Sequence, residues 1–263
     1  MALRVPLARN PRSGYPFVDG ALVIDRTLGY GRHNIAAFLQ RIAPFETVVD
    51  LGAGWGFDLA SAAEICPAAK LYAVETYPLY VESLKKKYEV LALNLEKDPL
   101  PLADESIDVV MSNQVLEHVK EIFWILHEAS RVLRVGGHMI IGVPNLASYH
   151  NRLLLLLGMQ PTVIQNHSAH MRGYTRHDIL RSLQMIFPDG YELKGFRGAN
   201  FYPLPGFLAR PMAKLLPNGA WGIFLLLEKK RAYRDEFLRH PMEQKLETNF
   251  YLGDRRDRIA QAS

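Results

Sequence analysis

The sequence predicts an α/β fold built on a doubly wound, mainly parallel sheet, and three observations support this. A short apolar run at 47–51 leads at once into three glycines at alternate positions, Gly52, Gly54 and Gly56. A helix-forming stretch follows the glycines directly. Strand-like runs and amphipathic stretches then alternate along the chain. A strand, a glycine turn and a helix in this order open the nucleotide sites of doubly wound folds.

The glycine turn itself suits contact with a ligand. Glycine lets the chain turn sharply and brings the backbone close to a bound group. The helix that follows directs free N–H groups at a ligand anion. A dinucleotide fingerprint has the pattern Gly-x-Gly-x-x-Gly, whereas here the third glycine, Gly56, comes one residue early and Phe57 follows it. The turn therefore departs from the NAD pattern.

The elements before and after this turn follow in order. A helix is predicted before residue 44 because apolar residues recur at helical spacing. Tyr30, Arg32 and His33 are interpreted as its starting loop, with the edge of the ligand pocket as the alternative. The second strand, 70–75, ends in Glu75, about 20 residues past the glycines, which is the spacing of a carboxylate that binds ribose hydroxyls. An amphipathic helix at 78–87 and a third strand at 90–93 come next.

The next part of the chain predicts two strands around a long helix. The fourth strand is expected at 107–112. A helix starting at Glu117 and His118 carries apolar residues on one face and is expected to stop at Gly136–Gly137. An apolar strand at 139–143 follows it.

The C-terminal half is less regular. We expect a helix at 147–157 closed by Gly158, a long polar loop, and a helix capped by Thr175 with Asp178 three residues on. Strands are predicted at 191–196 and 221–228. The chain divides into an irregular segment (1–31), a main domain (32–230) and an extension (231–263). A lid or substrate segment at 147–175 and a covering segment at 200–218 belong to the main domain, and long loops of this kind are often lids.

Composition limits the class of protein. The chain has 263 residues, 49% hydrophobic and 22% charged, with a net charge of +4, and no basic run interleaved with aromatic residues predicts a nucleic-acid partner. A single cysteine, Cys66, rules out an internal disulfide and favours a cytoplasmic setting. No apolar run approaches the ~20 residues that span a bilayer, and the N-terminus lacks the apolar core of a signal peptide.

The stretch from Asp50 to Gly56, Asp-Leu-Gly-Ala-Gly-Trp-Gly, resembles the first motif of class I S-adenosylmethionine (SAM) methyltransferases. The runs at 100–102, 113–118 and 131–137 resemble the same family, and the resemblance covers residues 47–146. It implies a Rossmann-like sheet of seven strands in the order 3-2-1-4-5-7-6, with the last strand antiparallel. The pieces at 144–146, 151–153 and 170–176 are similar to methyltransferases of bacterial polysaccharide and surface-glycan clusters.

The resemblance also implies which residues bind the cofactor, SAM, and its product S-adenosylhomocysteine. They are Asp50, Gly52, Ala53, Gly54, Glu75, Thr76, Asn94, Leu95 and Asn113. Asn94 replaces the Asp that relatives often carry at the adenine edge, but an amide also hydrogen-bonds adenine. Asn113 is expected beside the methionine part of SAM.

Methyl transfer is an in-line displacement in which positioning matters most, and a base removes the proton of a hydroxyl acceptor. His118 is our candidate base, with a capping or pocket-lining histidine as the equal alternative. The candidate substrate-binding residues are His150, His167, His170 and Tyr174. His167 and His170 have metal-pair spacing, but no nearby Cys or acid completes a ligand set, so we predict no metal.

These features favour a SAM-dependent methyltransferase acting on an oxygen of a sugar, glycan or related small molecule, since the Asn-Pro-Pro-aromatic pattern of many amino-group methylators is absent. A quinone or phenol methylator and a SAM-binding, non-catalytic partner subunit are the alternatives. An NAD-dependent oxidoreductase is disfavoured by the early third glycine and the lack of a Tyr-x-x-x-Lys pair. The apolar, proline-broken stretch after Asn200 suits a homodimer interface, or peripheral contact with a membrane or glycan machinery.

Overall fold

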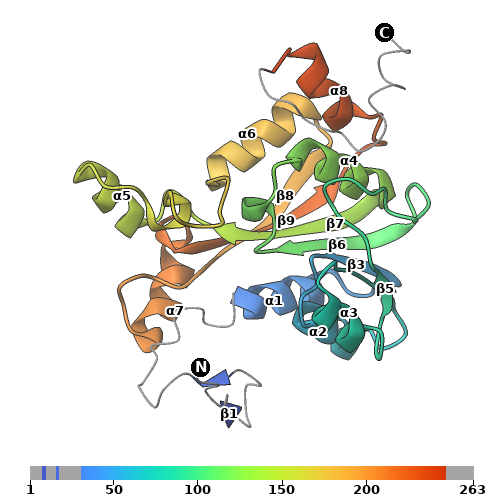
Figure 1. The fold of residues 1–263 in the computed structure, drawn as a ribbon, viewed down its shortest axis with the longest axis horizontal. Coiled ribbons are helices and arrows are strands. Elements are labelled where there is room, and N and C mark those ends of the chain that lie inside the picture. Colours follow the sequence, from blue (N-terminus) through green and yellow to red (C-terminus); the bar gives the residue numbers. More distant parts are fainter. Residues whose placement is uncertain (1–7, 10–15, 18–30, 247–263) are drawn as a thin grey trace, which may run out of the picture.

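The computed structural model describes residues 8–9, 16–17 and 31–246, and nearly all of these form one sheet with helices on both faces (Figure 1). The large sheet contains β3 (Thr47–Leu51), β4 (Lys70–Val74), β5 (Glu89–Leu91), β6 (Ile107–Asn113), β7 (Leu133–Pro144), β8 (Tyr191–Ala199) and β9 (Gly222–Lys229). Two short strands, β1 (Ala8–Arg9) and β2 (Pro16–Phe17), pair antiparallel by themselves.

The sheet order is β5-β4-β3-β6-β7-β9-β8. The strands β5, β4, β3, β6 and β7 pair in parallel, whereas β9 runs antiparallel to both of its neighbours, β7 and β8. Counted along the chain within this sheet, the order is the predicted 3-2-1-4-5-7-6 with an antiparallel last strand. The fold class inferred from the sequence is therefore confirmed.

The helices form two layers because neighbouring residues of each strand point to opposite faces. The helices are α1 (Arg32–Ile42), α2 (Phe57–Ile65), α3 (Pro78–Leu84), α4 (Ile122–Val132), α5 (Tyr149–Leu156), α6 (Arg176–Ile186), α7 (Gly206–Leu215) and α8 (Glu236–Glu243). Val48 belongs to the apolar cluster that includes residues of α1, α2 and α3, while the next residue, Val49, belongs to the cluster that includes residues of α4, α6 and α8. The two cores are thus separated by the sheet, and its central strands are buried on both sides.

The segment after β6 differs from the prediction at both ends of its helix. Glu117 and His118 do not start α4: they belong to a separate 3-10 turn, η2 (Leu116–His118), and α4 begins at Ile122. The predicted stop at Gly136–Gly137 was also wrong, because α4 ends at Val132 and both glycines lie inside β7. Leu133 already pairs with Ile107, and the positive φ of Gly136 (78°) accommodates the irregular start of the strand.

The remaining segments cover the ends of the sheet. Two further 3-10 turns, η3 (Thr162–Ile164) and η4 (Pro217–Gly219), lie in the predicted lid and covering segments. In the predicted extension, α8 packs on α4 through Leu238 and Trp124, and residues 247–263 lie outside the described part of the chain. Most of the predicted N-terminal segment, including Tyr30, lies outside it too. Among the helices described, none has both the length and the apolar character needed to cross a bilayer.

Candidate active site

The glycine turn joins β3 to α2 and has the backbone geometry that required glycine. Gly52, Gly54 and Gly56 all have positive φ, at 75°, 55° and 75°. A Cβ on Gly52 would come within 2.6 Å of Val115, whereas a Cβ on Gly54 would meet no atom within 4 Å. Side chains rarely adopt this φ, so Gly54 keeps an open space over the backbone between β3 and α2. That space is where a ligand can approach the chain.

Glu75, at the end of β4, is fixed beside this turn. Its Oε2 accepts a hydrogen bond from the backbone N–H of Gly54 at 2.9 Å. Its Oε1 accepts from the N–H groups of Thr76 and Tyr77, at 2.8 and 2.9 Å. The carboxylate is thereby held rigidly at the carboxyl edge of the sheet, and its remaining lone pairs can accept from a ligand diol.

An acidic cluster lies behind the turn. Asp50 is buried, and burial followed by repulsion from Asp58 raises its pKa well above the usual range. Burial also raises the pKa of Asp58, although Arg32 lies 3.6 Å away (Nε to Oδ1) and Asn113 donates to its Oδ2 at 2.9 Å. With Glu75 nearby, the acids outnumber the basic group Arg32, and a cationic ligand would stabilise the ionised forms of these carboxyl groups.

Two further residues contact Asp58 in this cluster. Arg32, interpreted from the sequence as part of a helix-starting loop, stands beside Asp58 because α1 packs on α2. Asn113 is held from two sides: its Nδ2 binds Asp58, and its Oδ1 is buried against Gly142, where a Cβ would approach to 2.7 Å. The amide of Asn113 therefore fixes Asp58.

The predicted adenine side lies after β5. Asn94 is exposed, and its Oδ1 accepts from the N–H of Glu96 at 2.9 Å while its own N–H donates to Asp98 at 2.7 Å. Its side-chain carbonyl thus shapes a tight turn, and the Nδ2 group is the part suited to an adenine acceptor. Leu95 is half-buried against the core, as a residue lying on a ring face would be.

The predicted lid segment is docked on the turn that follows β6. Met171 donates its backbone N–H to the carbonyl of Glu117 at 2.7 Å, and the hydroxyl of Tyr174 donates to the carbonyl of Leu116 at 3.1 Å. The Arg172 guanidinium donates to the carbonyl of Lys120 at 2.9 Å. Contacts to three backbone carbonyls hold residues 169–174 over η2, beyond the end of β6.

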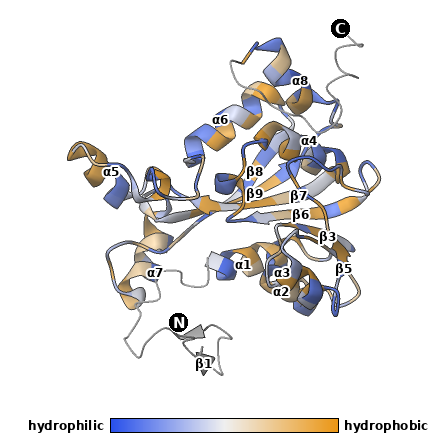
Figure 2. Cartoon of the chain, viewed as in Figure 1, coloured by the Kyte–Doolittle hydropathy of each residue, from blue (hydrophilic) through white to orange (hydrophobic). Residues whose placement is uncertain are grey.

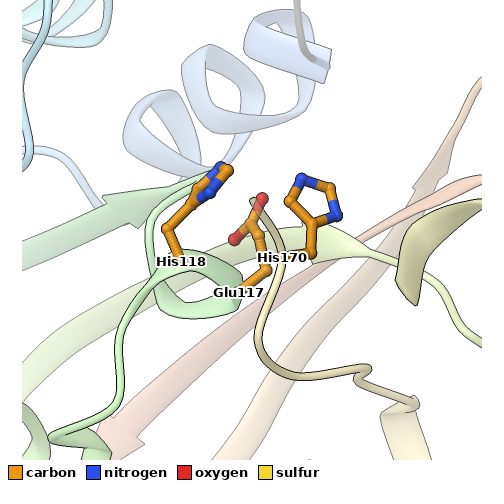
Figure 3. A group of neighbouring side chains, drawn as sticks. All are labelled: Glu117, His118 and His170. Atoms are coloured by element: carbon orange, nitrogen blue, oxygen red, sulfur yellow. The ribbon is translucent and has the colours of Figure 1, made fainter. Parts of the chain in front are cut away.

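Docking of the lid brings Glu117, His118 and His170 together (Figure 3). The rings of His118 and His170 meet edge to face with centroids 4.6 Å apart. Burial and the charge of His170 lower the pKa of His118, which favours a neutral imidazole with a free lone pair at neutral pH. His118 and His170 were both predicted as site residues, and the structure places them side by side.

Glu117 is the residue that the sequence analysis missed. Its side chain is 1% exposed, and burial raises its pKa to about 7. Neither carboxylate oxygen hydrogen-bonds any other residue in the described part of the chain. The signal available in the sequence was its position: an acid directly before a candidate catalytic histidine, at the end of a buried strand.

The other predicted substrate residues do not join this group. His150 lies on α5, with its Nε2 3.2 Å from the Thr162 hydroxyl and its ring against Tyr202. His167 is exposed and stands outside the cluster. Tyr174 uses its hydroxyl to bind Leu116, and burial raises its pKa, so it anchors the lid.

Two clefts lie away from the glycine turn. One, of about 220 Å³, is between α6 and α8. A larger one, of about 490 Å³, borders the lid segment, and its lining includes Arg152, Arg176 and His177. None of the predicted cofactor residues lines either of these two clefts.

Comparisons with known proteins bear on the class of protein to which the matched segment is similar. Residues 49–141 match the family model described as a methyltransferase domain. The chain is 39% identical over 143 residues to an arsenite methyltransferase of Halobacterium salinarum, covering 50% of this chain and 36% of that protein. It is 35% identical over 128 residues to a probable S-adenosylmethionine-dependent methyltransferase of Mycobacterium tuberculosis, covering 46% of this chain and 44% of that one. The chain thus spans less than half the length of these relatives.

Solved structures share the fold. A putative methyltransferase of Haloferax volcanii, determined in complex with the Trm112 methyltransferase activator, superposes with a TM-score of 0.56 at 16% identity, covering 77% of this chain and 92% of that one. A SAM-dependent methyltransferase of Thermotoga maritima, possibly a histamine N-methyltransferase, gives 0.53 at 19% identity, with 78% and 91% covered. These likenesses concern the fold, and the matched family model together with the relatives of similar sequence identifies residues 49–141 as a SAM-dependent methyltransferase domain.

Proposed function

We propose that this protein transfers a methyl group from SAM to an oxygen of a sugar, glycan or related small molecule. One observation carries the proposal: the open glycine turn is hydrogen-bonded to Glu75 and backed by an acidic cluster, inside the matched methyltransferase domain. SAM carries both a sulfonium and an ammonium charge, so an excess of carboxylates fits it better than it fits a pyrophosphate. When bound, SAM supplies a methyl group on a positively charged sulfur.

The residues around the turn have separate tasks in this proposal. Glu75 accepts hydrogen bonds from the ribose hydroxyls, and the backbone of Gly52–Gly54, including Ala53, holds the amino-acid end. Asp50 and Asp58, the latter positioned by Asn113, provide the negative field. Thr76, Asn94 and Leu95 border the adenine.

The acceptor lies between the strand ends and the docked lid. His118 accepts the proton of the acceptor hydroxyl, because its lowered pKa leaves it neutral at physiological pH. The lid segment excludes water from the reacting groups. His170 stands beside His118 and is placed to contact the acceptor, whereas His150 and His167 contact parts of it farther from the reacting atom.

The proposed class of acceptor, a sugar or glycan, is argued from the lid segment. The segment at 170–176, whose resemblance to surface-glycan methyltransferases is an expectation from the sequence, carries polar side chains and places His170 beside His118. A quinone or phenol acceptor would instead call for a wide apolar lining. A panel of sugar nucleotides, oligosaccharides, quinols and phenols, assayed with methyl-labelled SAM, tests this choice; methylation of quinols alone would overturn it.

An exposed apolar surface on α5 and α7 supports a further part of the proposal, peripheral contact with an anionic membrane. Figure 2 shows hydrophobic ends of both helices at the same end of the molecule. The surface includes Leu156, 82% exposed, and Phe207, 76% exposed. Exposed basic residues, Arg152, Arg210 and Lys214, lie on the same helices and suit anionic headgroups.

Vesicle co-sedimentation tests this contact. The protein should sediment with vesicles containing phosphatidylglycerol, and Leu156→Glu with Phe207→Glu should abolish this. Sedimentation velocity without lipid tests the alternative, a homodimer interface. If the wild type is a dimer, the two substitutions make it a monomer and vesicles are not bound, the surface is a homodimer interface.

The cofactor assignment is tested by ligand binding. S-adenosylhomocysteine should raise the melting temperature, and NAD should not. Glu75→Ala should weaken S-adenosylhomocysteine binding by ~1–3 kcal/mol, because it removes a charged acceptor at a half-buried site. Glu82→Ala, which removes an exposed acid on α3, is the matched control and should bind normally. Stabilisation by NAD instead, or unchanged affinity in Glu75→Ala, contradicts the assignment.

A further inference from the structure

We propose that Glu117, His118 and His170 form a binding site for a divalent transition-metal ion of the zinc type. From the sequence, no metal is predicted, because no Cys or acid near the His167–His170 pair completes a ligand set. In the structure, the acid beside His170 is Glu117, which comes from η2 at the end of β6. Two imidazoles and one carboxylate are a known ligand set for catalytic zinc, which keeps a further position open.

The distances support the site. One ligand atom from each of the three residues lies within 4.8 Å of the other two. Ligand atoms of a tetrahedral ion with bonds of about 2.0–2.1 Å are about 3.4 Å apart, so the group must close by about 1.4 Å at most. In Figure 3 the Glu117 carboxylate lies between the two imidazole rings.

The unpartnered carboxylate of Glu117 is the second, independent observation. A buried carboxylate without hydrogen bonds from other residues is costly, and proteins rarely retain one without a ligand. Both of its oxygens are buried, and the side chain is aimed at the two histidines. A divalent ion supplies the positive charge that the described residues around Glu117 do not.

His170 is already oriented as a metal ligand. Its Nδ1 lies 2.7 Å from the backbone carbonyl of Val163, so this nitrogen carries the proton and donates it. The Nε2 lone pair is then free, and a carbonyl behind the ring is the usual outer contact of a metal-bound histidine. The Nδ1 of His118 approaches the carbonyl of Ala169 more loosely, at 3.4 Å, which leaves its Nε2 available as well.

The bound ion would change how the acceptor hydroxyl is deprotonated. This catalytic role rests on the proposed methyltransferase function, whereas the existence of the metal site is independent of that function. Coordination occupies the lone pair that His118 would otherwise use as a base. An acceptor hydroxyl at the open position would then pass its proton to a solvent water before methyl transfer, because the ion lowers the pKa of the hydroxyl and stabilises the resulting oxyanion. The same site orients the acceptor, since three protein ligands leave few directions of approach.

The test measures metal binding directly, on the full chain without a histidine tag. After EDTA treatment and desalting, we expect one equivalent of Zn²⁺ to bind in competition with a chromophoric chelator, and Co²⁺ to give visible absorption bands typical of low coordination number. Glu117→Gln and His170→Ala should each weaken binding at least tenfold. His167→Ala, in the same lid segment but outside the cluster, should bind like wild type.

Two outcomes overturn the site: no stoichiometric binding by the wild type, or equal binding by Glu117→Gln and His170→Ala, with circular dichroism showing that the variants fold. Thermal shift with S-adenosylhomocysteine on the EDTA-treated protein separates this from the proposed function. Stabilisation by S-adenosylhomocysteine without zinc binding removes only the metal site. Zinc binding without any effect of S-adenosylhomocysteine removes only the methyltransferase proposal.

Discussion

Two glutamates on either side of the start of α4 are buried to the same degree but have opposite surroundings. Glu128 is 3% exposed and Glu117 is 1% exposed. Glu128 accepts from Arg131 through Nε at 2.9 Å and Nη2 at 2.7 Å, and from the N–H of Leu100 at 2.6 Å. Glu117 accepts no hydrogen bond from any other described residue.

The difference shows that partners, and not burial, decide the charge of a buried acid. Burial alone would raise the pKa of Glu128, but the hydrogen bonds from Arg131 and the contact with His127 outweigh it and hold the pKa at about 2. Burial without such partners raises the pKa of Glu117 to about 7. Glu128 is therefore a structural acid that ties the loop at 100–104 to α4, whereas Glu117 is available to a ligand.

The largest change in the free energy of unfolding is expected from replacing Glu128, the buried acid that is paired with Arg131. Glu128→Gln removes the buried counterion of Arg131. The guanidinium then keeps only the exposed carboxylate of Asp104 and the carbonyls of Leu100 and Leu102 as partners. Removing one partner of a buried ion pair costs about 3–5 kcal/mol. Urea unfolding should show this loss, with Glu82→Gln on α3 as an exposed control that stays within about 0.5 kcal/mol. A loss no larger than the control would show that the pair contributes nothing to stability.

The pH dependence of the free energy of unfolding tests whether Glu128 is held in its ionised form. The pKa of Glu128 is lower in the folded protein, about 2, than its ordinary value of 4.5. Its contribution is thus fully present above pH 4.5 and is lost as the pH falls toward 2. The difference is worth about 3 kcal/mol. The gap in unfolding free energy between wild type and Glu128→Gln should narrow over this range, and a constant gap would contradict the assignment.

The contrast also explains which features the sequence could reveal. The glycine turn and Glu75 depend on consecutive residues and on one strand spacing, so they were predictable, as was the strand order through the family resemblance. The family resemblance includes the run at 100–102 and Arg131 as separate motifs. Their contact through Glu128 is visible only in the folded chain.

The cluster of Glu117, His118 and His170 could not be predicted in the same way. Its members come from η2 and from a loop after α5, and no periodicity links the two segments. What joins them is the docking of the lid on backbone carbonyls, such as that of Glu117 itself, which any residue type can supply. The end of α4 was misplaced for a related reason: strand pairing by Leu133 overrode the helix-ending preference of Gly136 and Gly137.

The smallest change in the free energy of unfolding, and one of opposite sign, is expected from replacing Glu117, the buried acid without a hydrogen-bond partner among the other described residues. Glu117→Met replaces a buried carboxyl that lacks partners with an apolar side chain of similar volume. In EDTA-treated protein at pH 8 this should raise the free energy of unfolding by about 1–3 kcal/mol, because the cost of burying the carboxylate disappears. Added Zn²⁺ should then stabilise the wild type and leave Glu117→Met unchanged. Destabilisation of Glu117→Met in EDTA, of the size expected for Glu128→Gln, would mean that Glu117 has a structural partner and that the two acids are alike.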